Sequence, residues 1–342
     1  MRLARARCAL ACAALAACSP RAEPTKPPQQ PPLHVGPLTD FVSAAGLRWL
    51  ALARPRELAQ NADFARAAAG LLPEARLAAY ARTTGVELRS VTQGLIAGFD
   101  FATLYMAEMR TGHELVEERF EERLLQGAVV ESRHPKLQKL TGVVGQTPET
   151  LVVSRGQWVA VTVGDPSPAR VAESFALRRL KRSPPALRGS ALSTLPAHLE
   201  RAPLRFYAPG PFAGEWARAA RGLVGQSLAV GIAATPRTAA ALDACIVLSG
   251  DHAAPELDAE ARMLGAWQDL SQSSTGVLLG LNEASGPAQV KVTPEHVELC
   301  VALSLPAIAR GLRAAVSADA WELLDVRKPQ NPDTSHLPVQ KR

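Results

Sequence analysis

The chain has 342 residues, of which 47% are hydrophobic and 20% charged, and its formal net charge is +6. The first 17 residues hold three arginines and no acidic residue, so the remainder carries a formal charge of only +3. So small a positive charge gives no reason to expect nucleic acid as a partner. After this first segment no apolar run is long enough for a transmembrane helix, and residues 40–326 suffice for two domains of ordinary size.

The N-terminus has the features of a secretory signal. Three arginines within the first seven residues precede an uncharged apolar run, Cys8–Ala17, which is too short to span a bilayer. The run ends in Leu15-Ala16-Ala17-Cys18, which resembles the lipobox of bacterial lipoproteins. This resemblance implies that residues 1–17 are removed and that an acylated Cys18 makes the membrane a partner of the protein. The alternative is an ordinary signal peptide that is cut at a nearby small residue, with Cys18 incidental.

The residue after the cysteine indicates which membrane is involved. In lipoproteins a serine at this position, here Ser19 rather than Asp, implies the outer membrane, with the body facing the periplasm or the cell surface. Residues 18–38 contain seven prolines and are predicted to be an extended tether. Residues 327–342 are polar and are predicted to be a disordered tail.

The body contains short motifs that recur in the same order. Leu47–Ala51 is similar to Leu204–Ala208, and Gln93–Phe99 is similar to Gln226–Ile232. In each half we then expect a strand, a polar corner with a histidine, an acidic helix, a hairpin and a closing helix. The first half gives Thr103–Met109, His113, His113–Gln126, Leu151–Gly164 and Pro168–Lys181; the second gives Leu242–Leu248, His252, Pro255–Ser271, Gln289–Leu305 and Pro306–Ser317.

This pattern predicts an α+β fold made of two tandem copies of one unit. Each copy, ferredoxin-like in style, would have an antiparallel sheet with helices packed on one face. We place repeat 1 at 39–182, a linker at 183–201 and repeat 2 at 202–326. Repeat 1 contains an additional segment of strand and loop at 128–149.

The body also resembles, more loosely, uncharacterised envelope lipoproteins that are built from repeated α+β units. The residues that carry this resemblance are Thr84-Gly85-Val86, after the first long helical stretch. It implies no activity.

Two cysteines remain after the signal and the lipid site are set aside. Cys245 and Cys300 each lie on the more polar face of a predicted strand. In an oxidising periplasm they are candidates for a disulfide, and the alternative is two separate buried thiols.

Two stretches are similar to catalytic motifs but depart from them. His113–Glu117 begins like the zinc-protease motif His-Glu-x-x-His but has Glu in place of the second His, so the ligand pair is missing. Gly225–Ala229 is near a Gly-x-Ser-x-Gly nucleophile elbow, but its expected order is helix then strand, and its last Gly is Ala. We therefore expect no catalytic residue, no metal site and no cofactor.

Two further groups are candidates for binding. The basic cluster Arg178, Arg179, Lys181 and Arg182 could contact an anionic surface, or could simply be the solvated end of a helix. His113 and His252 are related by the repeat and could mark equivalent ligand corners, or could simply hydrogen-bond their turns.

These observations favour a lipid-anchored, non-catalytic envelope module that binds or scaffolds a protein or a cell-wall component. The alternative is an envelope hydrolase whose catalytic carboxylates are brought together only by the fold.

Overall fold

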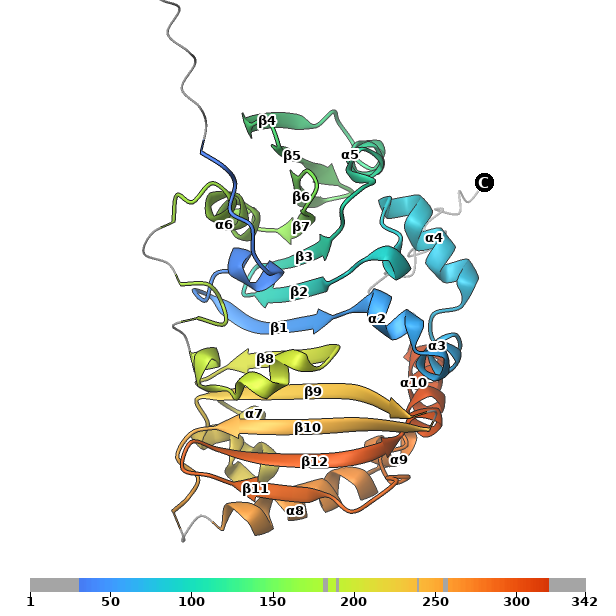
Figure 1. Ribbon diagram of the computed structural model, residues 1–342, viewed down its shortest axis with the longest axis vertical. Helices are drawn as coiled ribbons and strands as arrows, with labels where there is room; N and C mark the ends of the chain where they lie inside the picture. The colour runs from blue at the N-terminus through green and yellow to red at the C-terminus, as the bar shows by residue number, and fades with distance from the viewer. Residues whose placement is uncertain (1–30, 181–183, 189–190, 239, 255–257, 320–342) are drawn as a thin grey trace, which may run out of the picture. The chain divides into compact units, whose positions relative to one another are not determined.

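Antiparallel strand pairing organises the computed structural model (Figure 1). The structure describes residues 31–180, 184–188, 191–238, 240–254 and 258–319, and from Leu33 onward they belong to one compact unit. The strands are β1 (Leu47–Ala53), β2 (Gly94–Phe99), β3 (Ala102–Glu108), β4 (Val129–His134), β5 (Leu137–Val144), β6 (Thr147–Ser154), β7 (Trp158–Gly164), β8 (Leu204–Pro209), β9 (Ala229–Thr238), β10 (Ala241–Ser249), β11 (Gln289–Val292) and β12 (His296–Ser304).

Helices connect these strands and flank them. The α-helices are α2 (Pro55–Gln60), α3 (Ala62–Ala68), α4 (Glu74–Thr84), α5 (His113–Glu122), α6 (Ser167–Ala176), α7 (Glu215–Arg218), α8 (Ala259–Gln272), α9 (Ser274–Leu278) and α10 (Leu305–Asp319). The 3₁₀ helices are η1 (Leu38–Phe41), η2 (Leu88–Ser90), η3 (Ala191–Thr194), η4 (Ala197–Arg201), η5 (Ala219–Gly222) and η6 (Val224–Gln226).

The described strands form a single 12-stranded sheet in the order β11-β12-β10-β9-β8-β1-β2-β3-β7-β6-β5-β4. The predicted α+β class with an antiparallel sheet is therefore confirmed. The predicted hairpins are also present, because β6 pairs with β7 and β11 pairs with β12, both antiparallel. The additional segment at 128–149 forms β4, β5 and the first residues of β6.

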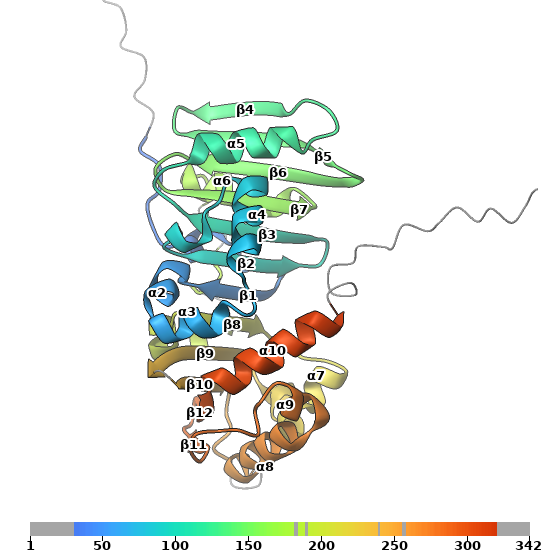
Figure 2. The same ribbon diagram turned by 90° about the vertical axis from the view of Figure 1, so that its right-hand side faces the viewer.

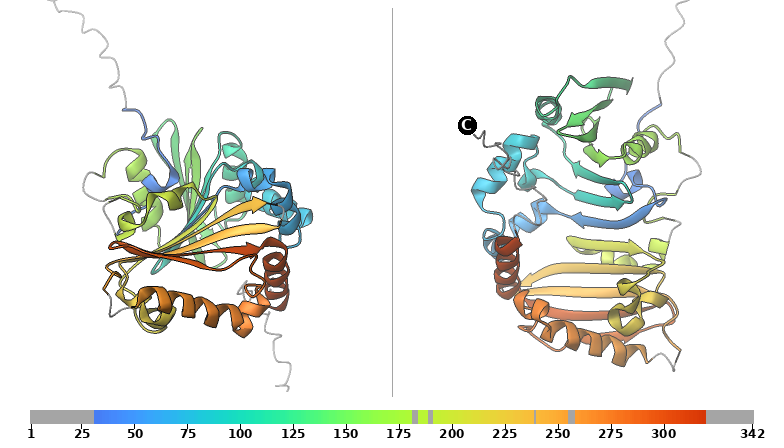
Figure 3. Two further views of the ribbon diagram at one scale, coloured as in Figure 1. Left: turned by 60° about the horizontal axis from the view of Figure 1, so that its bottom comes forward. Right: turned by 180° about the vertical axis from the view of Figure 1, so that it is seen from behind.

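The two faces of the sheet are covered differently. Face A, which carries Ala51, Ile96 and Tyr105, is covered by α5 near β6 and by α8, α9 and α10 near β12 (Figures 2 and 3). Face B carries the alternate residues, among them Leu50 and Leu95, and buries them under η1, α6 and residues 184–202. The main core cluster lies under face B.

The expectation that helices pack on one face only is wrong. Residues Ala169, Ala172 and Phe175 of α6 pack on face B, whereas Val116 and Phe120 of α5 pack on face A. The apolar residues of face B in the first half form one core cluster with η1 and residues 186–202, and α6 belongs to that cluster rather than to the one that α5 joins.

The two halves agree in strand order but differ in their closing helices. The orders β1-β2-β3-β7-β6 and β8-β9-β10-β12-β11 correspond strand by strand. In contrast, α6 and α10, which would be equivalent in a repeat, lie on opposite faces of the sheet. The duplication therefore stays a prediction.

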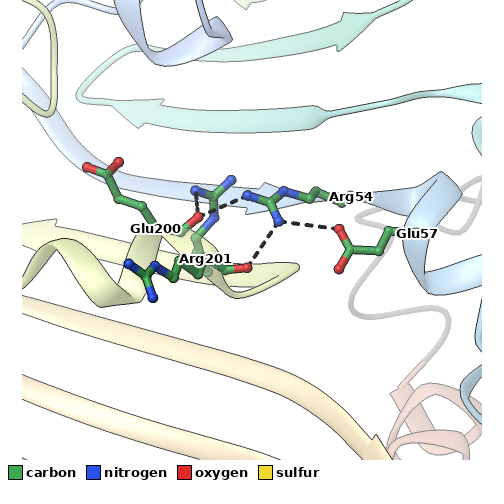
Figure 4. Close-up of polar contacts among 5 residues, drawn as sticks. Arg54, Glu57, Glu200 and Arg201 are labelled. Atoms are coloured by element: carbon green, nitrogen blue, oxygen red, sulfur yellow. Dashed lines mark hydrogen bonds and ion pairs between the residues drawn. The ribbon is translucent and has the colours of Figure 1, made fainter.

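The halves meet where β1 pairs antiparallel with β8, from Leu50 opposite Tyr207 to Ala53 opposite Leu204. Arg54, just after β1, donates to the carbonyls of Glu200 and Arg201, both at 3.0 Å, and pairs with Glu57 at 3.3 Å (Figure 4). The last carbonyls of a helix lack partners within the helix, so an arginine at the end of η4 satisfies them. This contact fastens residues from both halves to each other.

Two predicted boundaries need correction. The tether was expected to run to residue 38, but Leu33 and Leu38 are buried in the main core cluster. The linker was expected at 183–201, but its described residues Ala186, Leu192 and Leu199 are buried under face B. Both segments contribute apolar side chains to the core, which a Pro-rich and polar composition does not reveal. The signal and the tail, 1–17 and 327–342, lie outside the described residues.

Candidate ligand cavity

An apolar cavity of about 710 Å³ lies on the central part of face A. Residues of β1, β2, β3, β7, β8 and β9 form its floor, and residues of α4 and α5 form its walls. Cavities of this size are ordinary for small-molecule sites. The apolar lining includes Ala51, Ile96, Ala107, Val116, Phe120, Val161, Val163, Phe206 and Ile232.

The cavity exists because the middle of face A is not covered by packed side chains. Ile96 is 37% exposed and Tyr105 is 45% exposed, although both lie on strands in the interior of the sheet order. Helix α4 has no buried residue, so it does not fill this space. Contiguous exposed apolar surface of this kind marks a binding site more often than a structural accident.

Gly85 sets the position of α4 relative to α5. It ends α4 in the left-handed conformation, with φ 74°, and donates from its N–H to the carbonyl of Ala81. A Cβ atom at Gly85 would lie 2.8 Å from the backbone nitrogen of Val116. Only glycine allows both the cap and this close approach. The Thr84-Gly85-Val86 motif thus determines how one wall of the cavity is formed.

The cavity contains one ion pair. Arg123, the C-cap of α5, lies with its Nη2 3.2 Å from Oε2 of Glu149 on β6, and its guanidinium stands 5.6 Å from the centre of the Phe120 ring. The Glu149 side chain is 10% exposed and that of Arg123 is 29% exposed. Burial raises the pKa of the Tyr80 phenol, against the opposing effects of a Thr84 hydrogen bond and the Arg123 charge. Tyr80 is therefore neutral at physiological pH.

The lining contains few groups with catalytic chemistry. Among the described residues that line the cavity, Glu149 is the one carboxylate, and there is no His, Ser, Cys or Lys. A glycosidase needs two opposed carboxyl groups, and a nucleophilic hydrolase needs a nucleophile beside a base. The described lining residues contain neither of these two arrangements.

Neither predicted histidine corner lines this cavity. His113 and His252 are both buried, and burial lowers the pKa of each imidazole. For His113 the charge of Glu114 opposes this effect, and for His252 that of Asp251 does. Both residues sit at the corners predicted for them: His113 is the first residue of α5, and His252 precedes α8 in the chain.

The structure brings Ser227 and His252 together, which the sequence did not indicate. Ser227 Oγ lies 3.3 Å from His252 Nε2, and its hydroxyl donates to the Leu223 carbonyl at 2.8 Å. The imidazole Nε2 must then donate to Oγ, which is the reverse of what a general base does. His252 Nδ1 has no hydrogen-bond partner, so no third group orients the ring. This pair fastens the corner and is not a nucleophilic site.

Cys245 and Cys300 lie opposite each other on β10 and β12 and form a disulfide, with an S–S distance of 2.09 Å. They share face B with Glu298, whose carboxylate lies 2.8 Å from His198 Nε2. The two sulfurs and Glu298 form a cluster with metal-ligand spacing among the described residues. Sulfurs joined in a disulfide are not thiolate ligands, so the cluster is not a metal centre in this form.

The basic cluster falls partly outside the described residues. Arg178 and Arg179 are exposed after the end of α6, and Lys181 and Arg182 are not among the described residues, nor is Cys18. Arg178 adopts φ 55°, so the chain turns sharply away from the helix at this point.

Sequence reasoning missed the cavity because its parts are distant in the chain. Arg123 and Glu149 are separated by 26 residues, and the floor combines strands from both halves. A signal in the sequence is that β2 and β3 carry large side chains on both faces, as in Leu95-Ile96 and Leu104-Tyr105.

Comparisons with known proteins do not identify a family for the chain. No family model matches the chain, and no curated protein matches it. Among solved structures, the chain is similar to crystal form III of TP0453, with 12% identity and a TM-score of 0.48, over 82% of this chain and 99% of that one. Crystal form IV of TP0453 matches with 9% identity and a TM-score of 0.45, over 81% of this chain and 96% of that one.

Proposed function

We propose that this protein is a lipid-anchored envelope module, without catalytic activity, that binds the acyl chain of a lipid in the cavity on face A. The observation that carries the proposal is the cavity itself: about 710 Å³, with a predominantly apolar lining. Transfer of an acyl chain from water into such a lining is favourable by about 0.8 kcal/mol for each buried methylene group.

The predicted anchor supports a role at a membrane. Cys18 would hold the body close to a lipid surface, where acyl ligands are abundant. The binding of a separate envelope protein or cell-wall component stays a prediction. No helix within the described part of the chain has both the length and the apolar character needed to cross a bilayer.

The hydrolase alternative has less support. It requires catalytic carboxylates that the fold brings together, but Glu149 is the one carboxylate among the described residues of the cavity, and it pairs with Arg123.

Ile96→Asp tests the acyl site. Ile96 lines the cavity and is already 37% exposed, so the change should leave the fold intact while placing a charge where the acyl chain would lie. We expect the affinity of the purified protein for 1-monooleoylglycerol, supplied below its micellar concentration, to fall by at least about tenfold.

Phe101→Glu is the matched control. Phe101 is 84% exposed and does not line the cavity, so removal of this apolar side chain should leave the affinity unchanged. Equal losses in the two variants, or no saturable binding to the unmodified protein, would refute the acyl site.

Cys18→Ala tests the anchor. In cells supplied with labelled palmitate we expect the label to disappear from this protein, because the acylated residue is gone. Cys12→Ala, a change to another cysteine of the signal, should leave the label in place. Persistent labelling of the Cys18→Ala protein would refute lipidation at this residue.

A further inference from the structure

The charges inside the cavity restrict which lipid headgroup fits there. Arg123 and Glu149 form a pair with no net charge, set in an apolar lining. Arg205 also borders the cavity, but its guanidinium donates to the Glu200 carbonyl at 2.8 Å, and its strand position directs the side chain to face B. The charged pair at the Arg123 end of the cavity therefore has no net charge of its own.

The pair has unused hydrogen-bonding capacity. A guanidinium has five N–H donors, and the hydrogen bond from Arg123 Nη2 to Glu149 uses one of them. The Arg123 side chain is 29% exposed, so a ligand oxygen can accept from an N–H group that Glu149 does not use. The Glu149 carboxylate offers only acceptors, so it suits a ligand group that donates.

A bare anion fits this arrangement poorly. A carboxylate or phosphate placed at Arg123 would stand beside the Glu149 carboxylate, and like charges in a weakly polar site repel each other strongly. A headgroup that has an acceptor and a donor but no charge can satisfy both partners and leave the ion pair intact.

Building on the proposed function, we propose that the ligand is a neutral acyl lipid of the monoacylglycerol type. Its ester carbonyl accepts from Arg123, and its hydroxyl donates to Glu149. Tyr80 and Tyr105, half-exposed on the wall and floor of the cavity, add phenol groups that are polar but carry no charge. The acyl chain lies along Ile96 and Val161.

The selectivity of the cavity is tested with two ligands that share one acyl chain. Dissociation constants are measured for 1-monooleoylglycerol and for oleate, both below their micellar concentrations at pH 7.5. We expect the unmodified protein to bind monooleoylglycerol at least about fivefold more tightly.

Glu149→Gln converts the neutral pair into a single positive charge of the same shape. We expect the ratio of the two dissociation constants to change by at least about tenfold in favour of oleate. Arg123 then attracts the oleate carboxylate, and the repulsion by the Glu149 carboxylate is gone. Arg123→Met should weaken the binding of monooleoylglycerol. It should not increase the affinity for oleate above that of the unmodified protein.

Glu122→Gln is the matched control, because it removes the same charge next to Arg123. Glu122 pairs with Arg119, its side chain is 51% exposed, and it does not line the cavity. The selectivity ratio should stay as in the unmodified protein.

The outcomes separate this inference from the proposed function. If the unmodified protein prefers oleate, or if Glu149→Gln leaves the ratio of the two dissociation constants unchanged, the proposal of a neutral headgroup is wrong. The proposal of an acyl-binding site is not affected by either result. Absence of saturable binding of either ligand overturns both.

Discussion

His113 and His252 are the buried residues whose protonation most clearly opposes folding. Burial lowers the pKa of both imidazoles below the ordinary value of 6.5. Around His113 the charges of Glu114 and Arg155 act in opposite directions, and near His252 Asp251 opposes the effect of burial. Between the folded and the unfolded pKa, the unfolded chain binds more protons, so the free energy of unfolding increases with pH.

We therefore predict a loss of stability on mild acidification. The contribution of the two histidines is complete above pH 6.5 and is lost as the pH falls from 6.5 through their folded pKa values. His252→Gln keeps a hydrogen-bonding group but does not titrate, so its urea midpoint should fall less between pH 7.5 and pH 5.0 than that of the unmodified protein.

Ser227→Ala serves as the control for this experiment. It removes the same hydrogen bond but keeps the buried imidazole, so its pH dependence should match that of the unmodified protein. If His252→Gln loses as much stability on acidification as the unmodified protein, the buried neutral imidazole is not the cause.

At the residue level the sequence indicated some placements but not the contacts. Cys245 and Cys300 were expected on the polar faces of two strands, and their direct opposition depends on the register of β10 against β12. The Arg123–Glu149 pair had no signal at all, because neither residue belongs to a motif and the pairing requires α5 to pack over β6.

Among the elements, the strands with alternating side chains were the most predictable. The stretch Trp158–Val163 lies wholly within β7, and the predicted helices at 113–126 and 306–317 correspond to α5 and α10 with shifted ends. Period-two alternation is a local property of the chain, so it can be read without knowledge of the tertiary structure.

The positions of the helices were less predictable than their existence. Helices α6 and α10 both follow the last strand of a hairpin, yet they pack on opposite faces of the sheet. The side on which a helix packs depends on which apolar surface is left open by other segments, and for α6 this surface is shared with residues 184–202. The residues of a helix and its neighbours in the sequence therefore do not indicate which face of the sheet the helix covers.

Helix α4 is the element on which the cavity depends most. It has no buried residue, but Gly85 fixes its C-terminal end against the backbone of α5. A helix held by its end rather than by its whole apolar face leaves space beneath it. This arrangement explains how an apolar cavity persists on a sheet whose opposite face is fully packed.

For the whole molecule, the sequence predicted the class of fold but not the continuity of the sheet. The two predicted units are joined through β1 and β8, so the 12 described strands form one sheet rather than two. The junction matters for function because residues from both sides of it, Ile96 and Ile232 among them, line the same cavity. Neither half alone forms the complete cavity.

Photolabelling shows directly whether an acyl chain occupies the cavity on face A. A monoacylglycerol with a diazirine in the middle of its acyl chain is bound to the purified protein, irradiated, and the labelled peptides are identified by mass spectrometry. We predict saturable labelling within residues 74–123 and 158–164, in competition with unlabelled monooleoylglycerol. Labelling confined to α8, α9 and α10, or labelling that unlabelled lipid does not reduce, would show that the acyl chain does not bind in this cavity.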